Sequence, residues 1–284
     1  MAEQFAVTGA AGFLGGHIAR HLCRMGRVVG VDRMPASPDS PQVESLQLDI
    51  CSPLPQSDIA PGATVIHAAA SMNAGDVGEL WNVNVNGTRN VLEWAVKVKA
   101  KHFIFTSTGG VYGYARDRYR REDEQLNPIG YYGHTKWLGE ALCRMYSSLY
   151  GFDLTILRLY FPYGPGQKTG IFTLIHRSIL EGTPLSIKPR GSPRMNPVHA
   201  EDIAAAVGLA AENHVGATTY NVCGDDVLTF LDVVRLFEQH LHRTAELSFT
   251  SVDDGDLLGD NSLIKQALGW KPRRQIGEIL AIRW

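Results

Sequence analysis

Tyr132 and Lys136 stand four residues apart, at the start of a stretch with helical apolar spacing that runs to Gly151. On a helix, this spacing places both side chains on one face, so the lysine ammonium can approach the phenol. A nearby positive charge favours the phenolate and lowers the phenol pKa from its usual value of about 10. Such a phenol can exchange a proton with a substrate hydroxyl. The same spacing is also common on helix surfaces that carry no chemistry, so the surrounding elements must decide between the two interpretations.

A hydroxyl side chain is available from the preceding part of the chain. The apolar run 102–106 predicts a buried strand, and Thr108 follows it, 24 residues before Tyr132. In open α/β sheets, ligands bind where the strands end, so chemistry is expected here. The sequence therefore predicts that Thr108, Tyr132 and Lys136 meet at one edge of a sheet.

Three glycines near the start of the chain, Gly9, Gly12 and Gly15, separate a short apolar run from a helical pattern. They lack the Cβ atoms that would keep a diphosphate away from the backbone, and the following helix offers unpaired N–H groups and a positive dipole end. Their G-x-x-G-x-x-G spacing is wider at the front than the commonest dinucleotide fingerprint, and a glycine-rich turn without a ligand shows the same pattern. Asp32 adds the confirming context, because it ends a second apolar run where a carboxylate can bind the hydroxyls of an adenosine ribose.

The segment T-G-A-A-G-F-L-G at residues 8–15 resembles the first turn of the extended short-chain dehydrogenase/reductase family, in its NAD-dependent epimerase/dehydratase group. The order of glycine turn, threonine, tyrosine and lysine also resembles that family, and the likeness covers nearly all 284 residues. The resemblance implies that Thr108 hydrogen-bonds the reacting oxygen, that Tyr132 is the acid and base, and that Lys136 also holds the nicotinamide ribose. The nicotinamide charge would join the ammonium in lowering the pKa of Tyr132 toward neutrality.

By the same resemblance, NAD is the expected cofactor. Asp32 favours NAD because a carboxylate repels the 2′-phosphate of NADP, although the adjacent Arg33 partly offsets this effect. The predicted cofactor-binding residues are Gly9, Gly12, Phe13, Leu14, Gly15, Asp32, Arg33, Asp49, Ile50, Ala68, Ala69, Ala70, Asn84, Thr106, Tyr132, Lys136, Tyr160 and Pro162. Asp49 has the alternative of a carboxylate in a surface loop, and Asn84 that of an exposed helix asparagine. His67 is interpreted as a packed histidine at the end of a strand.

The predicted substrate-binding residues are Thr108, Phe161 and Arg194. Phe161 stands where nucleotide-sugar enzymes of the family usually have an asparagine that binds the substrate diphosphate, and its alternative is simply to pack. Arg194 is a candidate partner for a substrate phosphate, but it is one residue out of register with the family's arginine. An exposed arginine without such a role is therefore its alternative.

The alternation of strand and helix patterns predicts an α/β protein. We expect a doubly wound parallel sheet, the Rossmann fold, with a small discontinuous C-terminal substrate domain. Residues 1–160 plus 197–224 are assigned to the NAD-binding domain, and residues 161–196 plus 225–284 to the small substrate-binding domain. The helical patterns at 77–99 and 138–149 carry enough apolar residues to bury more than one face. By resemblance to the family, they predict a homodimer joined by a four-helix bundle.

Composition argues against several other classes of protein. A net charge of −2 and a pI near 6.5 give no support for a nucleic-acid or membrane partner. Four cysteines without a C-x-x-C pair, and an N-terminus without the features of a signal peptide, predict reduced thiols and a cytoplasmic location. No apolar run reaches the length of roughly 18 residues that spans a bilayer. No metal site is expected.

Three functions remain open. The first is a nucleotide-sugar epimerase, similar to UDP-glucose 4-epimerase, that acts by transient hydride transfer from the substrate to bound NAD. Family dehydratases and decarboxylases resemble one another in placing carboxylates just after the threonine, where this chain has Gly109 and Gly110, so elimination is disfavoured. The alternative is an NAD(P)H-dependent keto-sugar or aldehyde reductase that uses the same three residues in one direction. A non-catalytic NAD-sensing module is disfavoured, because none of the three side chains is lost.

Overall fold

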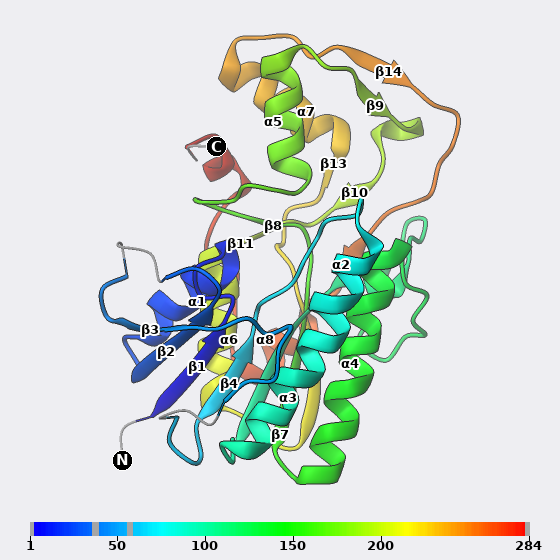
Figure 1. Ribbon diagram of the computed structural model, residues 1–284. Helices are drawn as coiled ribbons and strands as arrows, with labels where there is room; N and C mark the ends of the chain where they lie inside the picture. The colour runs from blue at the N-terminus through cyan, green and yellow to red at the C-terminus, as the bar shows by residue number, and fades with distance from the viewer. Residues whose placement is uncertain (1–2, 36–39, 56–58, 282–284) are drawn as a thin grey trace.

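A parallel sheet of seven strands, in the order β12-β7-β5-β4-β1-β2-β3, forms the centre of the protein (Figure 1). The computed structural model describes residues 3–35, 40–55 and 59–281, so the predicted domain ends 1–2 and 282–284 lie outside it. The strands of this sheet are β1 Gln4–Thr8, β2 Arg27–Asp32, β3 Val43–Gln47, β4 Thr64–His67, β5 His102–Thr108, β7 Asp153–Leu159 and β12 Ala217–Val222. The strand order reverses between β1 and β4, which confirms the predicted doubly wound fold.

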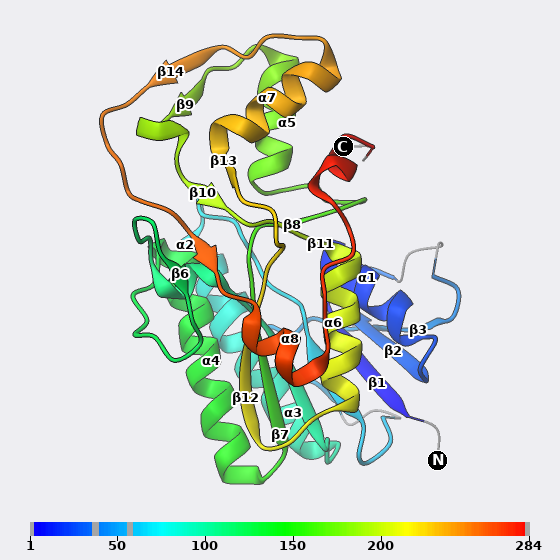
Figure 2. The same ribbon diagram turned by 180° about the vertical axis from the view of Figure 1, so that it is seen from behind.

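Helices cover both faces of this sheet. Within β1, Phe5 and Val7 pack into the core on one face and Ala6 into the core on the other, and all three are buried. Such double burial explains why the strands are nearly continuous apolar runs in the sequence. The first face is covered by α1 Phe13–Leu22, α6 Ala200–Glu212 and α8 Ser262–Leu268, and the second by α3 Thr88–Lys97 and α4 Gly130–Tyr150 (Figures 1 and 2).

The helical pattern predicted at 77–99 contains a change of helix type. The short helix α2, Val77–Trp81, continues into a π-helical segment, η1 Asn82–Gly87, and then into α3. This π-helical segment has the sequence N-V-N-V-N-G, and π-helical turns often mark functional sites. Its Asn84 is buried rather than exposed.

A smaller body with its own core lies beyond the carboxyl ends of the strands (Figure 1). Helix α7 begins at a capping box, in which Thr229 and Asp232 each accept a hydrogen bond from the other's backbone N–H. The elements of this body are α5 Ile171–Glu181, β9 Leu185–Ile187, η3 Pro189–Gly191, β10 Arg194–Met195, β13 Leu228–Thr229, α7 Phe230–Leu241, β14 Leu247–Phe249 and η4 Ile276–Ala281.

Short strand pairs connect the two bodies. β8 Pro162–Tyr163 pairs with β11 Val198–His199, and β6 Tyr119–Arg120 pairs with β15 Leu258–Gly259. The chain then returns to the sheet, where Ile264 and Trp270 join the core on the α1 and α6 face. This part of the predicted segment 225–284 therefore packs against the sheet. The predicted domain boundaries remain a prediction.

None of the helices among the described residues combines the length and apolar character needed to cross a membrane. Among the same residues, no three histidine, cysteine, aspartate or glutamate side chains come together in a way that could hold a metal ion.

Candidate active site

A cavity of about 860 Å³ opens at the carboxyl edge of the sheet, between the sheet and the smaller body. Every predicted cofactor, catalytic or substrate residue lines it except Asn84, Tyr160 and Arg194. Residues from strands far apart along the chain thus line one continuous cavity.

The glycine turn forms one end of this cavity. Gly9 has a φ of +74°, and a Cβ on Gly15 would lie only 2.0 Å from the carbonyl oxygen of Gly9. Both positions therefore need glycine. Helix α1 begins directly after Gly12, which provides no side-chain cap for the first N–H groups of the helix. These N–H groups and the helix dipole form a binding place for a diphosphate.

Asp32 is fixed by backbone donors at the end of β2. Its Oδ2 accepts a hydrogen bond from the N–H of Ala11 (3.1 Å), and its Oδ1 accepts one from the N–H of Met34 (3.0 Å). A carboxylate oxygen can accept more than one hydrogen bond, so the fixed group still has capacity toward the cavity, which Arg33 also lines. Asp49 lines the same end and accepts a hydrogen bond from the N–H of Cys51 (2.9 Å). It is also exposed and follows β3, so its role toward the cofactor stays a prediction.

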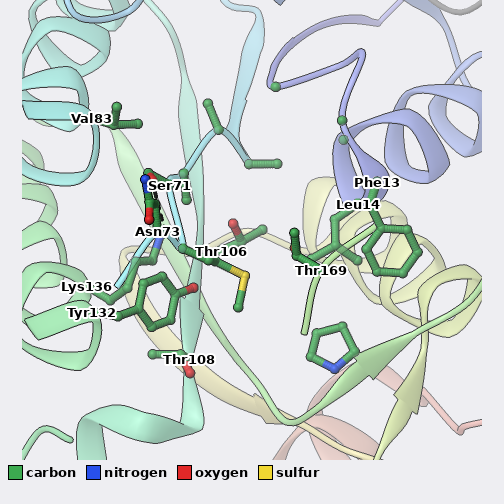
Figure 3. Close-up of a pocket in the computed structure, with 18 of the residues that line it drawn as sticks. Phe13, Leu14, Ser71, Asn73, Val83, Thr106, Thr108, Tyr132, Lys136 and Thr169 are labelled. Atoms are coloured by element: carbon green, nitrogen blue, oxygen red, sulfur yellow. Dashed lines mark hydrogen bonds between the residues drawn. The ribbon is translucent and has the colours of Figure 1, made fainter. Parts of the chain in front are cut away.

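The three residues proposed for chemistry lie together on the opposite wall. Figure 3 shows Tyr132 and Thr108 next to each other, with Lys136 beside the tyrosine. Thr108 ends β5, and its Oγ1 accepts a hydrogen bond from the N–H of Gly110 (3.1 Å), which fixes the start of the short helix η2, Gly109–Tyr112. Tyr132 and Lys136 lie one turn apart on α4, so the predicted helical pairing is confirmed.

The predicted direction of the Tyr132 pKa was wrong for the protein alone. Burial raises the pKa of this phenol to about 12. Burial also lowers the pKa of Lys136 to about 8, while Cys143 and Glu140 act in the opposite direction. Lys136 is only 2% exposed, and its Nζ lies 4.1 Å from the centre of the Phe105 ring. Desolvation of the Tyr132 phenol therefore outweighs its attraction to the Lys136 ammonium. A lowered pKa of Tyr132 must come from the charge of the bound nicotinamide.

Asn84 supports the cavity wall from behind. Its Oδ1 accepts a hydrogen bond from the N–H of Ser71 (2.8 Å), and its Nδ2 donates to the Ser71 carbonyl oxygen (2.9 Å) and to Thr135 Oγ1 (3.0 Å). The alternative of an exposed asparagine is wrong, since Asn84 is buried. His67 is buried as predicted, with one ring nitrogen bonded to Thr8 Oγ1 (2.7 Å) and the other to Thr88 Oγ1 (2.9 Å).

Arg194 and Tyr160 lie outside the cavity lining. The guanidinium of Arg194 donates to Asp256 (2.9 Å) and Asp117 (2.6 Å), so carboxylates of the same chain occupy it. The alternative interpretation, an exposed arginine without a role, does not describe Arg194 fully either, because its side chain is held by these two carboxylates. The ring of Tyr160 packs against Gly109 and Gly259, and its hydroxyl has no hydrogen-bond partner in the structure.

Phe161 lines the cavity and also packs against the smaller body. Its φ is +43°, a left-handed conformation that is rare for a large side chain. Phe161 thus packs, as its alternative describes, and it also faces the cavity, where a contact with substrate stays a prediction.

A polar loop that sequence reasoning missed lines the cavity between β4 and α2. Glu79 accepts hydrogen bonds from Ser71 Oγ (2.9 Å) and Asn73 Nδ2 (2.8 Å), and Figure 3 shows Ser71 and Asn73 close together. Ser71 and Asn73 directly follow Ala70, but Met72 stands between them, so the sequence gives no clear pattern for this loop. Gln167, Thr169 and Gly170, at the start of α5, were missed as well.

The comparisons with known proteins agree with this geometry. The family model described as "NAD dependent epimerase/dehydratase family" matches residues 5–223. The chain belongs to this family. Among its relatives is a UDP-glucuronate 4-epimerase of Thermodesulfobacterium geofontis (strain OPF15), 27% identical over 311 residues, which cover 99% of this chain and 95% of the relative.

Solved structures of the epimerase/dehydratase family have the same architecture. The structure of MoeE5 in complex with UDP-glucuronic acid and NAD is 27% identical, with a TM-score of 0.86 over 98% of this chain and 96% of the other. That of UDP-glucuronic acid 4-epimerase from Bacillus cereus, in complex with UDP-glucuronic acid and NAD, is 25% identical, with a TM-score of 0.84 over the same shares.

Proposed function

We propose that this protein is an NAD-dependent epimerase that inverts a hydroxyl-bearing carbon of a nucleotide sugar. The observation that carries the proposal is the meeting of Thr108, Tyr132 and Lys136 in the cavity that also holds the glycine turn and Asp32. The UDP-glucuronate 4-epimerase among the relatives, and the Bacillus cereus structure with bound UDP-glucuronic acid and NAD, support the choice of substrate class.

The residues present are suited to NAD. The diphosphate would lie against the N–H groups at the start of α1, and the adenosine ribose would lie beside Asp32. Lys136 would hold the nicotinamide ribose next to Tyr132. When bound, NAD accepts a hydride from the reacting carbon and later returns it.

In this mechanism, Tyr132 moves the proton and Thr108 orients the oxygen. The Tyr132 phenolate takes the proton of the sugar hydroxyl while the hydrogen on the same carbon leaves as hydride, so a ketone forms. Thr108 donates a hydrogen bond to the ketone oxygen. After the ketone turns over in the cavity, Tyr132 gives the proton back and hydride returns to the other face. One acid and base is enough for both half-reactions.

The turn after Thr108 argues against elimination. A Cβ on Gly109 would lie 2.5 Å from the Tyr160 ring, so the side chain of a second acid has no room at this position. Without that acid, Tyr132 is the proton carrier beside the reacting carbon. This arrangement supports reversible hydride transfer rather than loss of water.

A reductase remains a second candidate because of the charges in the cavity. Among the described residues that line it, the cationic side chains are Arg33 and Lys136, and the wall around Phe161 and Pro162 is neutral. A keto-sugar or aldehyde without a diphosphate would need no further cation.

An assay of the purified protein separates the two candidates. We expect proton NMR to show interconversion of a UDP-hexose or UDP-hexuronic acid and its 4-epimer, with no net change in NAD. Stoichiometric consumption of NADH or NADPH with a carbonyl substrate, and no epimer formed, would instead establish the reductase.

We further propose that the protein forms a homodimer through α2, α3 and α4. Trp81, Trp137, Met145 and Leu149 on these helices are exposed, whereas Leu92 and Ala95, within the predicted pattern 77–99, are buried in the sheet core. Neighbouring exposed apolar side chains on adjoining helices are typical of a surface that pairs with a second copy. All four cysteines are free thiols, which supports a cytoplasmic location.

A further inference from the structure

One carboxylate behind the active site is shared by three elements. Glu140, on α4 one turn after Lys136, is 1% exposed. Its Oε1 accepts a hydrogen bond from Ser107 Oγ on β5 (2.7 Å). The same carboxylate binds Arg158 on β7, with distances of 2.9 Å from Nε to Oε1 and 2.7 Å from Nη2 to Oε2. Ser107 directly precedes Thr108 in the chain, and Glu140 lies one helical turn after Lys136. The shared carboxylate thus contacts the neighbours of both active-site residues.

Arg158 extends this contact into a network of hydrogen bonds. Its Nη1 donates to the Tyr112 hydroxyl (2.5 Å), which in turn donates to Asn221 Oδ1 on β12 (2.9 Å). Arg158 is 2% exposed, and the fork-shaped contact with Glu140 is the strong form of a charge-assisted pair. A buried network whose members are satisfied in this way holds its elements rigidly.

We propose that Glu140 is a positioning residue whose carboxylate fixes Thr108 and Lys136 relative to each other across β5, α4 and β7. The inference rests on the proposed function, because it concerns the same active site. A shift of about 1 Å between reacting groups can cost ~100-fold in rate. Hydrogen bonds that hold β5, which carries Thr108, and α4, which carries Lys136, in fixed positions therefore matter for turnover.

The charge of Glu140 has a second consequence. Lys136 faces His67 from β4, the Phe105 ring from β5, and Cys143 and Glu140 from its own helix. Burial lowers the pKa of Lys136, and Glu140 opposes this lowering. Loss of the carboxylate charge should therefore let the ammonium lose its proton at lower pH.

The charges that act on Glu140 come from two elements. Arg158 faces the carboxylate from β7, and Arg144 approaches it from the next turn of α4 (3.4 Å). Ser107 contributes a neutral hydroxyl from β5. The carboxylate is therefore paired, and removal of its charge alone would leave Arg158 buried without its partner.

Ser107→Ala tests the positioning role without touching the ion pair. We expect kcat to fall ~10-fold or more while KM and NAD affinity stay within ~3-fold, because orientation is lost and binding is kept. Ser147→Ala is the matched serine control, because Ser147 lies on α4 far from the active site and donates to the Phe152 carbonyl oxygen (2.7 Å) just beyond the end of that helix. The control should keep the wild-type kcat.

Two variants test the charge. Glu140→Gln leaves Arg158 buried without its counter-ion, which destabilises the fold, so Glu140→Gln with Arg158→Met is made in parallel to replace both charges. In protein labelled with ¹⁵N-lysine, NMR follows the Lys136 titration, which needs no substrate. We expect its midpoint at lower pH in the folded Glu140 variants and at the wild-type value in Glu93→Gln, whose carboxylate lies on the neighbouring helix α3.

The proposal is overturned if folded Ser107→Ala and the double variant both keep the wild-type kcat, or if the Lys136 midpoint is the same in wild type and folded Glu140 variants. If the wild type converts no nucleotide sugar, the proposed function fails, and the lysine titration still decides the role of Glu140.

Discussion

The ring of Tyr160 lies so close to Gly109 that a Cβ on residue 109 would be 2.5 Å from its Cε1 and Cζ atoms. Gly109→Asp should therefore destabilise the protein by ~1–3 kcal/mol, as overpacking of a core does. Urea unfolding at neutral pH measures the change. Gly110→Ala is the control, since its Cβ would make only an ordinary contact of 3.4 Å with Thr108 Oγ1. Equal stability of the two variants would contradict the steric argument.

Asp32 should determine the choice between NAD and NADP. Asp32→Ala should weaken NAD binding by ~1–3 kcal/mol, the scale of hydrogen bonds to a charged group. Isothermal titration with both cofactors measures this effect. A wild-type protein that prefers NADP would refute the assignment and favour the reductase.

Tyr132 should contribute to chemistry and little to cofactor binding. We expect Tyr132→Phe to lower turnover by ~10²–10⁴ and to leave NAD affinity nearly unchanged, because only proton transfer is lost. Lys136→Ala should weaken NAD as well, because it removes a contact with the ribose. Steady-state kinetics and NAD titration of both variants provide the measurement. A Tyr132→Phe protein that keeps most of its activity would exclude this tyrosine as the acid and base.

The activity of the wild type should also decline above a certain pH. Burial lowers the pKa of Lys136 to about 8, so its ammonium loses the proton near that pH and activity should fall above it. A profile of kcat against pH tests this expectation. Turnover that stays level to pH 10 would show that the ammonium is not required.

Two buried histidines should make stability depend on pH. Burial lowers the pKa of His67 and of His102 from 6.5 to about 3. Below pH 6.5 the unfolded chain therefore binds protons that the folded protein does not, and stability is lost as pH falls toward 3. Each histidine accounts for roughly 2 kcal/mol between pH 7 and pH 5. Urea unfolding at both pH values should show a smaller loss for His102→Gln than for the wild type.

The proposed dimer can be tested on its exposed helix face. Met145→Lys with Leu149→Lys, two exposed positions on α4, should shift the protein from dimer to monomer in light scattering. Phe249→Lys is the control, because Phe249 is exposed on the smaller body. A wild-type monomer of 31.2 kDa at every concentration would refute the dimer.

The sequence predicted those features that depend on local spacing. The glycine turn, Asp32 at the end of β2 and the Tyr132–Lys136 pair each follow from residues near one another in the chain, and the structure places them as expected. Periodicity is informative where an element has one clear apolar face.

The errors concern residues whose environment comes from distant segments. Arg194 forms an ion pair with Asp256, which lies 62 residues away, and no local sequence pattern predicts that pair. The exposed position considered as the alternative for Asn84 is wrong, because a regular α-helical period does not describe the π-helical segment. The raised pKa of Tyr132 reflects burial, which depends on the whole fold.

The return of the chain to the sheet affects how the protein can be synthesised. Trp270 is buried in the sheet core, and its Nε1 donates to the Asp202 carbonyl oxygen on α6 (2.9 Å). Asp202 also accepts hydrogen bonds from the backbone N–H groups of Arg273 and Arg274 (both 3.0 Å). A nascent chain on the ribosome therefore cannot complete its cofactor-binding body until residues near 274 have emerged. Until then, the surface of α6 that receives Trp270 stays uncovered and available to chaperones.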